Sequence, residues 1–168
     1  YRSIGLGRDA WRSAGSGGAA DVTAVGYQAG YSVITGAGNL TAIGSQAGYS
    51  NTSGTSNTFV GSNAGYTNST GISNAFFGTM AGYNNNGTSN SFLGSLAGYT
   101  NTTGVQNTFM GTRAGYSNSL SDSNTFIGFD AGYSSIGGGS TGNNTFIGNT
   151  TGYTNTSGIY NTALGDSA

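Results

Sequence analysis

Five aspartates are the residues with which this chain could perform acid–base chemistry, and they lie far apart. Asp122 and Asp130 form the nearest pair, but Asp122 falls in a polar loop and Asp130 directly follows a short apolar segment. Hydrolysis needs a base, usually a His or two paired carboxylates, and the 168 residues include no His, Glu or Cys. We therefore predict that the protein is not an enzyme. We expect no catalytic residue, no cofactor and no metal site.

Charge excludes two further classes of function. Four Arg and five Asp are the only charged residues. Binding to nucleic acid requires clustered Lys and Arg to displace counterions from phosphates, and a polybasic membrane patch requires the same residues. We expect neither a nucleic-acid partner nor membrane contact by this segment.

Recognition is the chemistry that the remaining residues permit. A Gly recurs along the chain, and the residue two positions after it varies from copy to copy, as in Met80, Leu96, Arg113 and Asp130. Stacked about 4.8 Å apart, these four residues would form an apolar patch beside an ion pair, which makes them a candidate surface epitope. The plainer interpretation, which we favour, is that they are rim contacts between protomers. An exposed ion pair of this kind contributes at most about 1 kcal/mol.

These positions belong to a repeat, Asn-Thr-Phe-x-Gly-x-x-Ala-Gly-Tyr. Its clear copies begin at residues 57, 74, 90, 107, 124 and 144, with looser copies before them and a truncated copy at the end. The central Gly recurs every 16 to 20 residues. Because neither a helix pair nor a propeller blade fits into so short a period, each copy is predicted to form one coil of a β-solenoid.

Each coil has one strand-like segment, Thr-Phe followed by an aliphatic residue, with the β-branched and aromatic content of a strand. Successive side chains of a strand point to opposite faces, so the repeat predicts two apolar columns. The first column contains Phe59, Phe76, Phe92, Phe109, Phe126 and Phe146. The second contains Val60, Leu93, Met110, Ile127 and Ile147. We assign both columns to the structural core, one inside the coil and one against a neighbouring protomer, because a lone solenoid has only one interior.

The rest of the coil has three predicted parts. Ala-Gly-Tyr is expected to form a second strand, whose tyrosines make a half-buried ladder or, less plausibly, a surface on which sugars stack. The Asn before each first strand is expected to pair in a ladder with its equivalents. The polar stretch between Tyr and the next Asn varies in length and is predicted to be a surface loop.

Two regions follow from these patterns. Residues 1–20 are predicted to be a degenerate first coil or cap, and residues 21–168 the repeat array. Because the last copy stops before its Gly-Tyr, we expect the chain to be a fragment of a longer fibre.

Residues 23–29 (TAVGYQA), 41–47 (TAIGSQA) and 162–168 (TALGDSA) resemble the repeat of YadA-like head domains of trimeric autotransporter adhesins. The chain is also similar to repeats of bacteriophage tail fibres. The coil here is longer, Phe often replaces Ala, and Gly-Tyr is added. The resemblance implies a left-handed parallel β-roll assembled as a homotrimer, with a role in attachment.

We therefore expect a structural or adhesive segment of an extracellular, cell-surface or virion fibre. Its partners would be further copies of itself and a host surface protein or glycan. One alternative is an ice-binding solenoid using the Thr/Asn/Ser triplets at 67–69, 100–102 and 154–156. A purely structural filament subunit is another.

Overall fold

The computed structural model describes residues 2–12, 21–34, 38–135 and 142–168. Within these ranges the regular secondary structure consists of ten strands of three residues each. They are β1 (Ile4–Leu6), β2 (Thr23–Val25), β3 (Thr41–Ile43), β4 (Thr58–Val60), β5 (Ala75–Phe77), β6 (Ser91–Leu93), β7 (Thr108–Met110), β8 (Thr125–Ile127), β9 (Thr145–Ile147) and β10 (Thr162–Leu164). No helix in the described ranges has the length and apolar character needed to cross a bilayer.

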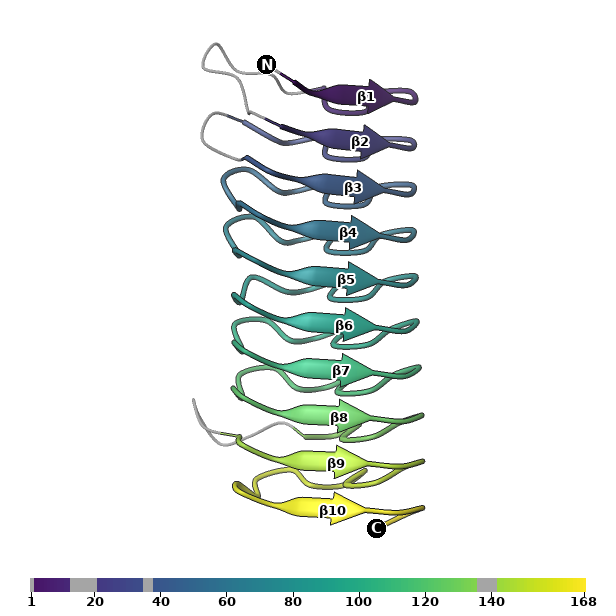
Figure 1. The fold of residues 1–168 in the computed structure, drawn as a ribbon, viewed down its shortest axis with the longest axis vertical. Helices are drawn as coiled ribbons and strands as arrows, with labels where there is room; N and C mark the ends of the chain where they lie inside the picture. Colours follow the sequence, from purple (N-terminus) through teal and green to yellow (C-terminus); the bar gives the residue numbers. More distant parts are fainter. Residues whose placement is uncertain (1, 13–20, 35–37, 136–141) are drawn as a thin grey trace.

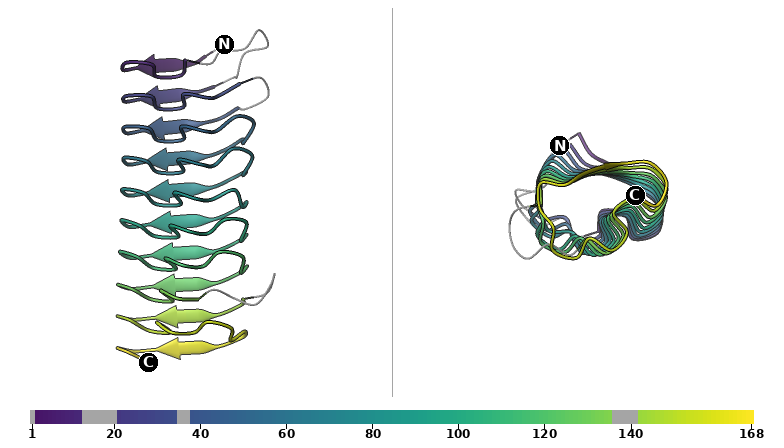
Figure 2. Two further views of the ribbon diagram at one scale, coloured as in Figure 1. Left: turned by 180° about the vertical axis from the view of Figure 1, so that it is seen from behind. Right: turned by 90° about the horizontal axis from the view of Figure 1, so that it is seen from below.

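The ten strands form one parallel sheet in sequence order, each pairing with the strand of the next coil (Figure 1). Equivalent residues of the repeat lie side by side, so that Phe59 pairs with Phe76 and Phe76 with Phe92. Viewed along the rod, the coils superpose on one closed outline (Figure 2). The protein is therefore an all-β parallel solenoid with coils of about 17 residues, as the repeat predicted.

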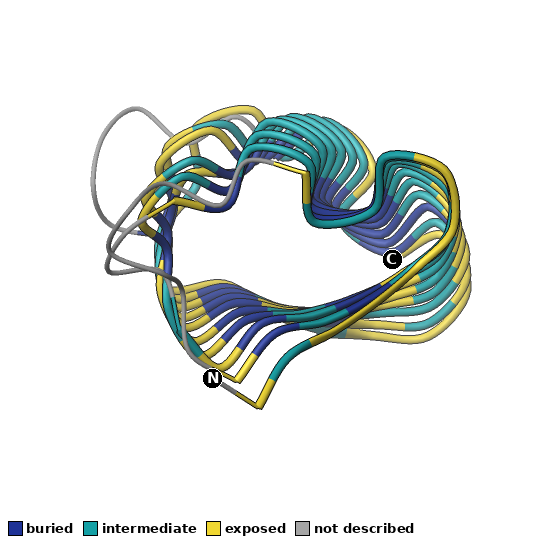
Figure 3. Ribbon diagram, turned by 90° about the horizontal axis from the view of Figure 1, so that it is seen from above, coloured by how far each residue is buried: buried dark blue, intermediate teal, exposed yellow. Residues whose placement is uncertain are grey.

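The Phe column lies inside the coil. Each Phe is the middle residue of its strand and is buried, whereas the residues on either side point outward. Buried segments line the inside of the coil in Figure 3. Consecutive rings stack with centroids 4.7 to 5.1 Å apart. This spacing is that of neighbouring strands, so the parallel ladder itself holds the rings in contact.

Two columns of buried Asn complete the interior. The first precedes strands β4 to β9: Asn107 Oδ1 accepts the backbone N–H of Asn124 at 2.9 Å, and its Nδ2 donates to Ser121 O at 2.9 Å. The expected Asn ladder is thus present, and it bonds to the backbone as well as from amide to amide. The second column lies in the segment that we predicted to be a surface loop. Its members, Asn51, Asn68, Asn85, Asn101 and Asn118, are fully buried.

The loop prediction was therefore wrong for part of each coil. Asn101 Nδ2 donates to Gly104 O three residues later at 2.9 Å, and Asn118 repeats this contact with Ser121. The bond closes a tight local turn inside the coil and satisfies the amide donor and the backbone oxygen that it joins. The longest of these segments, 134–143, is described only at its two ends, because residues 136–141 lie outside the described ranges.

Ala-Gly-Tyr does not form a second strand, contrary to our prediction. In the coil after β4, Asn63 and Gly65 have φ angles of 57° and 60°, in the left-handed region that strands do not use. The segment is a run of turns that still stacks on its neighbours, since Gly65 N donates to Ala81 O at 3.0 Å. A Cβ at the equivalent Gly82 would overlap the Phe76 ring. Gly at this position therefore makes room for the Phe column.

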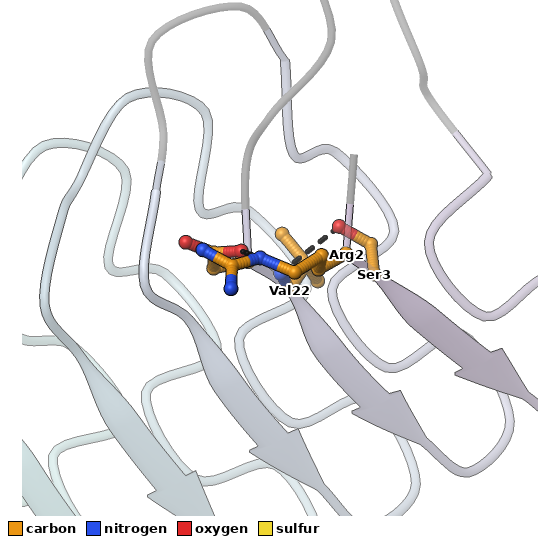
Figure 4. Close-up of polar contacts among 4 residues, drawn as sticks. Arg2, Ser3 and Val22 are labelled. Atoms are coloured by element: carbon orange, nitrogen blue, oxygen red, sulfur yellow. Dashed lines mark hydrogen bonds and ion pairs between the residues drawn. The ribbon is translucent and has the colours of Figure 1, made fainter.

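The first coil continues the same ladder. Strand β1 pairs in parallel with β2, and Ser3 Oγ accepts the backbone N–H of Val22 at 3.1 Å (Figure 4). Arg2 Nε lies 3.6 Å from a carboxylate oxygen of Asp21. Residues 2–12 of the predicted cap thus have the backbone of a coil, and residues 13–20 lie outside the described ranges.

The Phe column gives the first test of this packing. Phe109→Ala should lower the free energy of unfolding by about 3–5 kcal/mol, because it leaves a cavity between two stacked rings. Met110→Ala is the matched control: the side chain is 44% exposed and its loss should cost about 1 kcal/mol or less. Urea unfolding in dilute solution measures both. Equal losses in the two variants would contradict the inward assignment of Phe109.

The Asn ladder gives a second test, with a pH signature. Asn107→Asp replaces a donor to Ser121 O with a carboxylate, in a fully buried position. Burial raises the pKa of this carboxyl in the folded state above the unfolded value near 3.9. Relative to wild type, the variant should therefore be nearly normal at pH 3 and lose about 3–5 kcal/mol as the pH rises to 7.

Asn86→Asp is the control for that experiment. Asn86 is exposed and its side chain only accepts, from the Ser69 N–H and hydroxyl, so a carboxylate can keep both bonds. Its unfolding free energy should follow the wild-type pH profile. A loss in Asn107→Asp that did not change with pH would contradict destabilisation by an ionised carboxylate at this buried position.

Candidate functional site

The outer face of the sheet is a regular surface that runs along the rod. Each strand sends two side chains outward, and from β2 to β10 the second of them is always apolar. The five residues that we predicted for the second column lie here: Val60 and Ile127 are half-buried, and Leu93, Met110 and Ile147 are exposed. In a single copy this column is thus a solvent-facing apolar stripe, while the Phe column fills the interior.

The four residues of the predicted epitope are brought together. Leu96 N donates to Thr79 O, Arg113 N to Ser95 O and Asp130 N to Thr112 O, at 2.9 to 3.1 Å. Each residue therefore stacks on its equivalent one coil away. All four adopt the left-handed backbone conformation, with φ between 54° and 59°. Met80, Leu96 and Arg113 are half-buried, whereas Asp130 is buried.

The predicted ion pair is present, but it is not the exposed pair that we expected. Arg113 Nη2 lies 2.5 Å from Asp130 Oδ2, and the two side chains are 36% and 5% exposed. The guanidinium also lies over the rings of Phe129 and Tyr133, at 5.0 and 5.4 Å. Loss of the cation would leave a buried carboxylate, so the limit of about 1 kcal/mol for exposed pairs does not apply.

Phe129 and Tyr133 were not foreseen as neighbours of Arg113. Phe129 occupies the other variable position after the repeat Gly, and Tyr133 belongs to the Tyr ladder of the next coil. Their contact with Arg113 depends on the stacking of coils. One signal in the sequence could have found them: Arg113 and Asp130 are 17 residues apart, so residues close to Asp130 in the sequence also stack near Arg113.

The tyrosines form the predicted half-buried ladder. Eight of them stack in pairs with ring centroids 4.9 to 5.2 Å apart and nearly parallel planes. Burial, and then the neighbouring tyrosines, raise the pKa of the Tyr83 and Tyr116 hydroxyls above the usual value. Because each ring covers the faces of its neighbours, the ladder offers edges and hydroxyls along its length. A sugar needs an open ring face, so the geometry disfavours stacking of sugars here.

The Thr/Asn/Ser triplets do not form an outward array. Asn68 and Asn101, the middle residues of two triplets, are fully buried. Thr67 and Thr100 donate their hydroxyls to the backbone oxygens of Tyr83 and Tyr116, at 2.9 and 2.8 Å. An ice-binding face would need these hydroxyls regularly spaced and free towards water, so this arrangement disfavours that alternative.

The possible sites of N-glycosylation are of two kinds. Eight Asn stand in an N-x-S/T pattern. Asn51, Asn68 and Asn101 are fully buried in the interior Asn column, and Asn155 is half-buried. The exposed ones are Asn39, Asn86, Asn143 and Asn149.

The acidic residues are engaged separately. Asp122 Oδ1 accepts the Val105 N–H at 2.7 Å, while Asp130 pairs with Arg113. In the part of the chain that the structure describes, no group of three or more His, Cys, Asp or Glu is placed to hold a metal ion.

The chain matches no protein-family model, and comparisons with curated proteins and with solved structures gave no match either.

The buried carboxylate of Asp130 generates a prediction. Arg113→Ala should lower the free energy of unfolding by about 1–3 kcal/mol, because it removes the cation of a pair that is buried on one side. Arg113→Ala/Asp130→Asn should recover most of that loss. Asn63 occupies the equivalent position in another coil with the same backbone conformation. Thermal or urea unfolding measures the cycle, and equal losses in the single and double variants would exclude an energetic role for the pair.

Proposed function

We propose that this chain is a structural and adhesive segment of an extracellular attachment fibre on a cell or virion surface. The observation that carries the proposal is the unbroken ladder of ten in-register strands, which makes a rod with the same surfaces repeated along its length. Repeat proteins of this kind are extended by adding coils, since each coil contacts only its neighbours. A rod of this design spaces a binding surface away from its anchor.

The outer stripe supports lateral association. An apolar column runs from β2 to β10 and includes three side chains more than 40% exposed, Leu93, Met110 and Leu164; a continuous apolar patch of this kind is typical of an interaction site. We propose that copies of the chain cover this stripe for one another. A left-handed coil and a homotrimer are the forms implied by the resemblance to YadA-like heads and tail-fibre repeats.

Attachment requires surfaces that differ from coil to coil, and these lie away from the Phe and Asn columns. Met80 and Leu96 are two adjacent apolar residues, here called the Met80–Leu96 step, in the column formed by the second residue after each repeat Gly. The other residues of this column are mostly polar. The turns between the Tyr ladder and the next strand add Ser, Thr and Asn side chains. We propose a host surface protein or a glycan as the partner, met by these polar turns and the Met80–Leu96 step.

Arrays of glycans and extracellular-matrix proteins test attachment. The folded chain should bind a defined subset of the array, and Leu96→Glu should weaken that binding at least tenfold. Ser95→Glu is the matched control. Ser95 is exposed in the same coil, and this substitution adds the same charge one residue away from Leu96. Absence of binding, together with end-to-end polymerisation, would replace the adhesive role with that of a purely structural filament.

A further inference from the structure

The outer face departs from its repeat at two adjacent strands. From β2 to β10 the first outward residue is Thr in every strand except β5 and β6, which have Ala75 and Ser91. The same two strands carry large residues at the second outward position, Phe77 and Leu93, which are 40% and 48% exposed. A small and a large side chain thus occur together in the same coil, twice in succession.

These departures form a groove. It has a volume of about 390 Å³ and is lined on the outer face by Ala75, Phe77, Ser91, Leu93, Thr108 and Met110. None of these side chains is charged, and the shallow space lies where the Thr side chain is missing from β5 and β6. The groove is therefore shaped to receive an apolar side chain from outside.

A second copy of this chain is the occupant that fits the face. Strands of three residues are about 10 Å wide, and ten strands about 4.8 Å apart extend about 43 Å, which amounts to about 430 Å² of face. A stable interface needs about 800 Å² per partner. The contact must therefore run along the whole rod and include its flanks, and a second rod of the same length can cover the face over its full extent.

Area alone does not determine how two such rods align. A shift by one coil, about 4.8 Å, replaces Thr and aliphatic contacts with equivalent ones along most of the face and loses about a tenth of the area. Repetitive faces are prone to such slippage unless some position breaks the repeat. Strands β5 and β6 are where the outer face does so.

We propose that Ala75/Phe77 and Ser91/Leu93 set the axial register in which copies of the chain pack side by side and parallel through their outer faces. This inference rests on the self-association proposed above. In a cyclic assembly with its axis along the rod, each strand faces the strand of the same number, and the first outward column faces the second. Ala75 then meets Phe77 of the other copy, and Ser91 meets Leu93.

An antiparallel arrangement pairs these residues differently. Reversal of one rod about the middle of the sheet places Phe77 opposite Leu93 and Ala75 opposite Ser91. Large side chains then face each other and small ones leave a gap, and close-packed interfaces tolerate neither well. The co-occurrence of small and large residues within a coil therefore favours the parallel, in-register arrangement.

A side-chain exchange tests the proposal by sedimentation. Phe77→Ala and Ala75→Phe should each raise the dissociation constant for association at least tenfold, and Ala75→Phe/Phe77→Ala should restore it to within about threefold of wild type. Ser91→Phe/Phe77→Ala is the control, because it moves the large residue one coil away and should not rescue. Melting curves in dilute solution verify that each variant folds.

Cross-linking reports the register directly, since the chain contains no Cys. Copies carrying Thr125→Cys, mixed with copies carrying Ile127→Cys, should form mixed disulfide dimers on mild oxidation. Copies carrying Ile43→Cys should not cross-link to Ile127→Cys, because only the antiparallel arrangement sets these two second-column positions opposite each other. Cross-links between β3 and β8, or association unchanged by Phe77→Ala, would overturn the register proposal and leave the fibre proposal standing. A wild-type chain that sediments as one copy would overturn the self-association itself.

Discussion

In-register stacking of equivalent residues is the constraint on which the rest of this structure depends. A parallel strand pair places each residue beside its counterpart in the next coil, at a spacing that suits stacked rings and paired amides. Phe109 packs between Phe92 and Phe126, and Asn107 bridges the backbones of two coils. Each coil is therefore stabilised mainly by contacts with its neighbours. An insertion within the packed part of a coil would move its Phe and Asn out of line with those of the adjacent coils.

The interior is packed differently where the repeat changes. In the coils of β2 and β3 the Phe is replaced by Ala24 and Ala42, and the Asn positions are taken by Val22, Val33 and Leu40, all fully buried. A Cβ at Gly30 would contact Val33 and Leu40, which places both side chains beside the space that Phe fills elsewhere. In these coils branched aliphatic side chains at the Asn positions occupy space that the Phe ring fills elsewhere, which keeps the interior closely packed.

The same stacking explains why the surfaces of the rod are suited to association and attachment. Inside the coil, repetition is enforced by packing, and outside it is not. The outer stripe retains apolar residues although none of them is fully buried within one chain, whereas the Met80–Leu96–Arg113–Asp130 column changes from apolar to charged along the rod. The fibre proposal draws on this contrast: a constant face is suited to further copies of the chain, and a varying face is suited to a partner of a different kind.

The sequence by itself determined the solenoid, the length of its coil and the two apolar columns, because a fixed period and the alternation of side chains along a strand are local properties. Which column lies inside the coil was decided by the tertiary structure, which buries the Phe column. The sequence also placed Arg113 against Asp130, since a 17-residue separation is one coil. Only the tertiary structure decided that Ala-Gly-Tyr is a run of turns, because the left-handed conformation of Asn63 and its equivalents is imposed on residues as different as Met80 and Asp130. It also decided that Asn68 and Asn101 are interior. An Asn in a polar segment has the same local sequence whether it faces water or the neighbouring coil, and only the closure of the coil distinguishes the two.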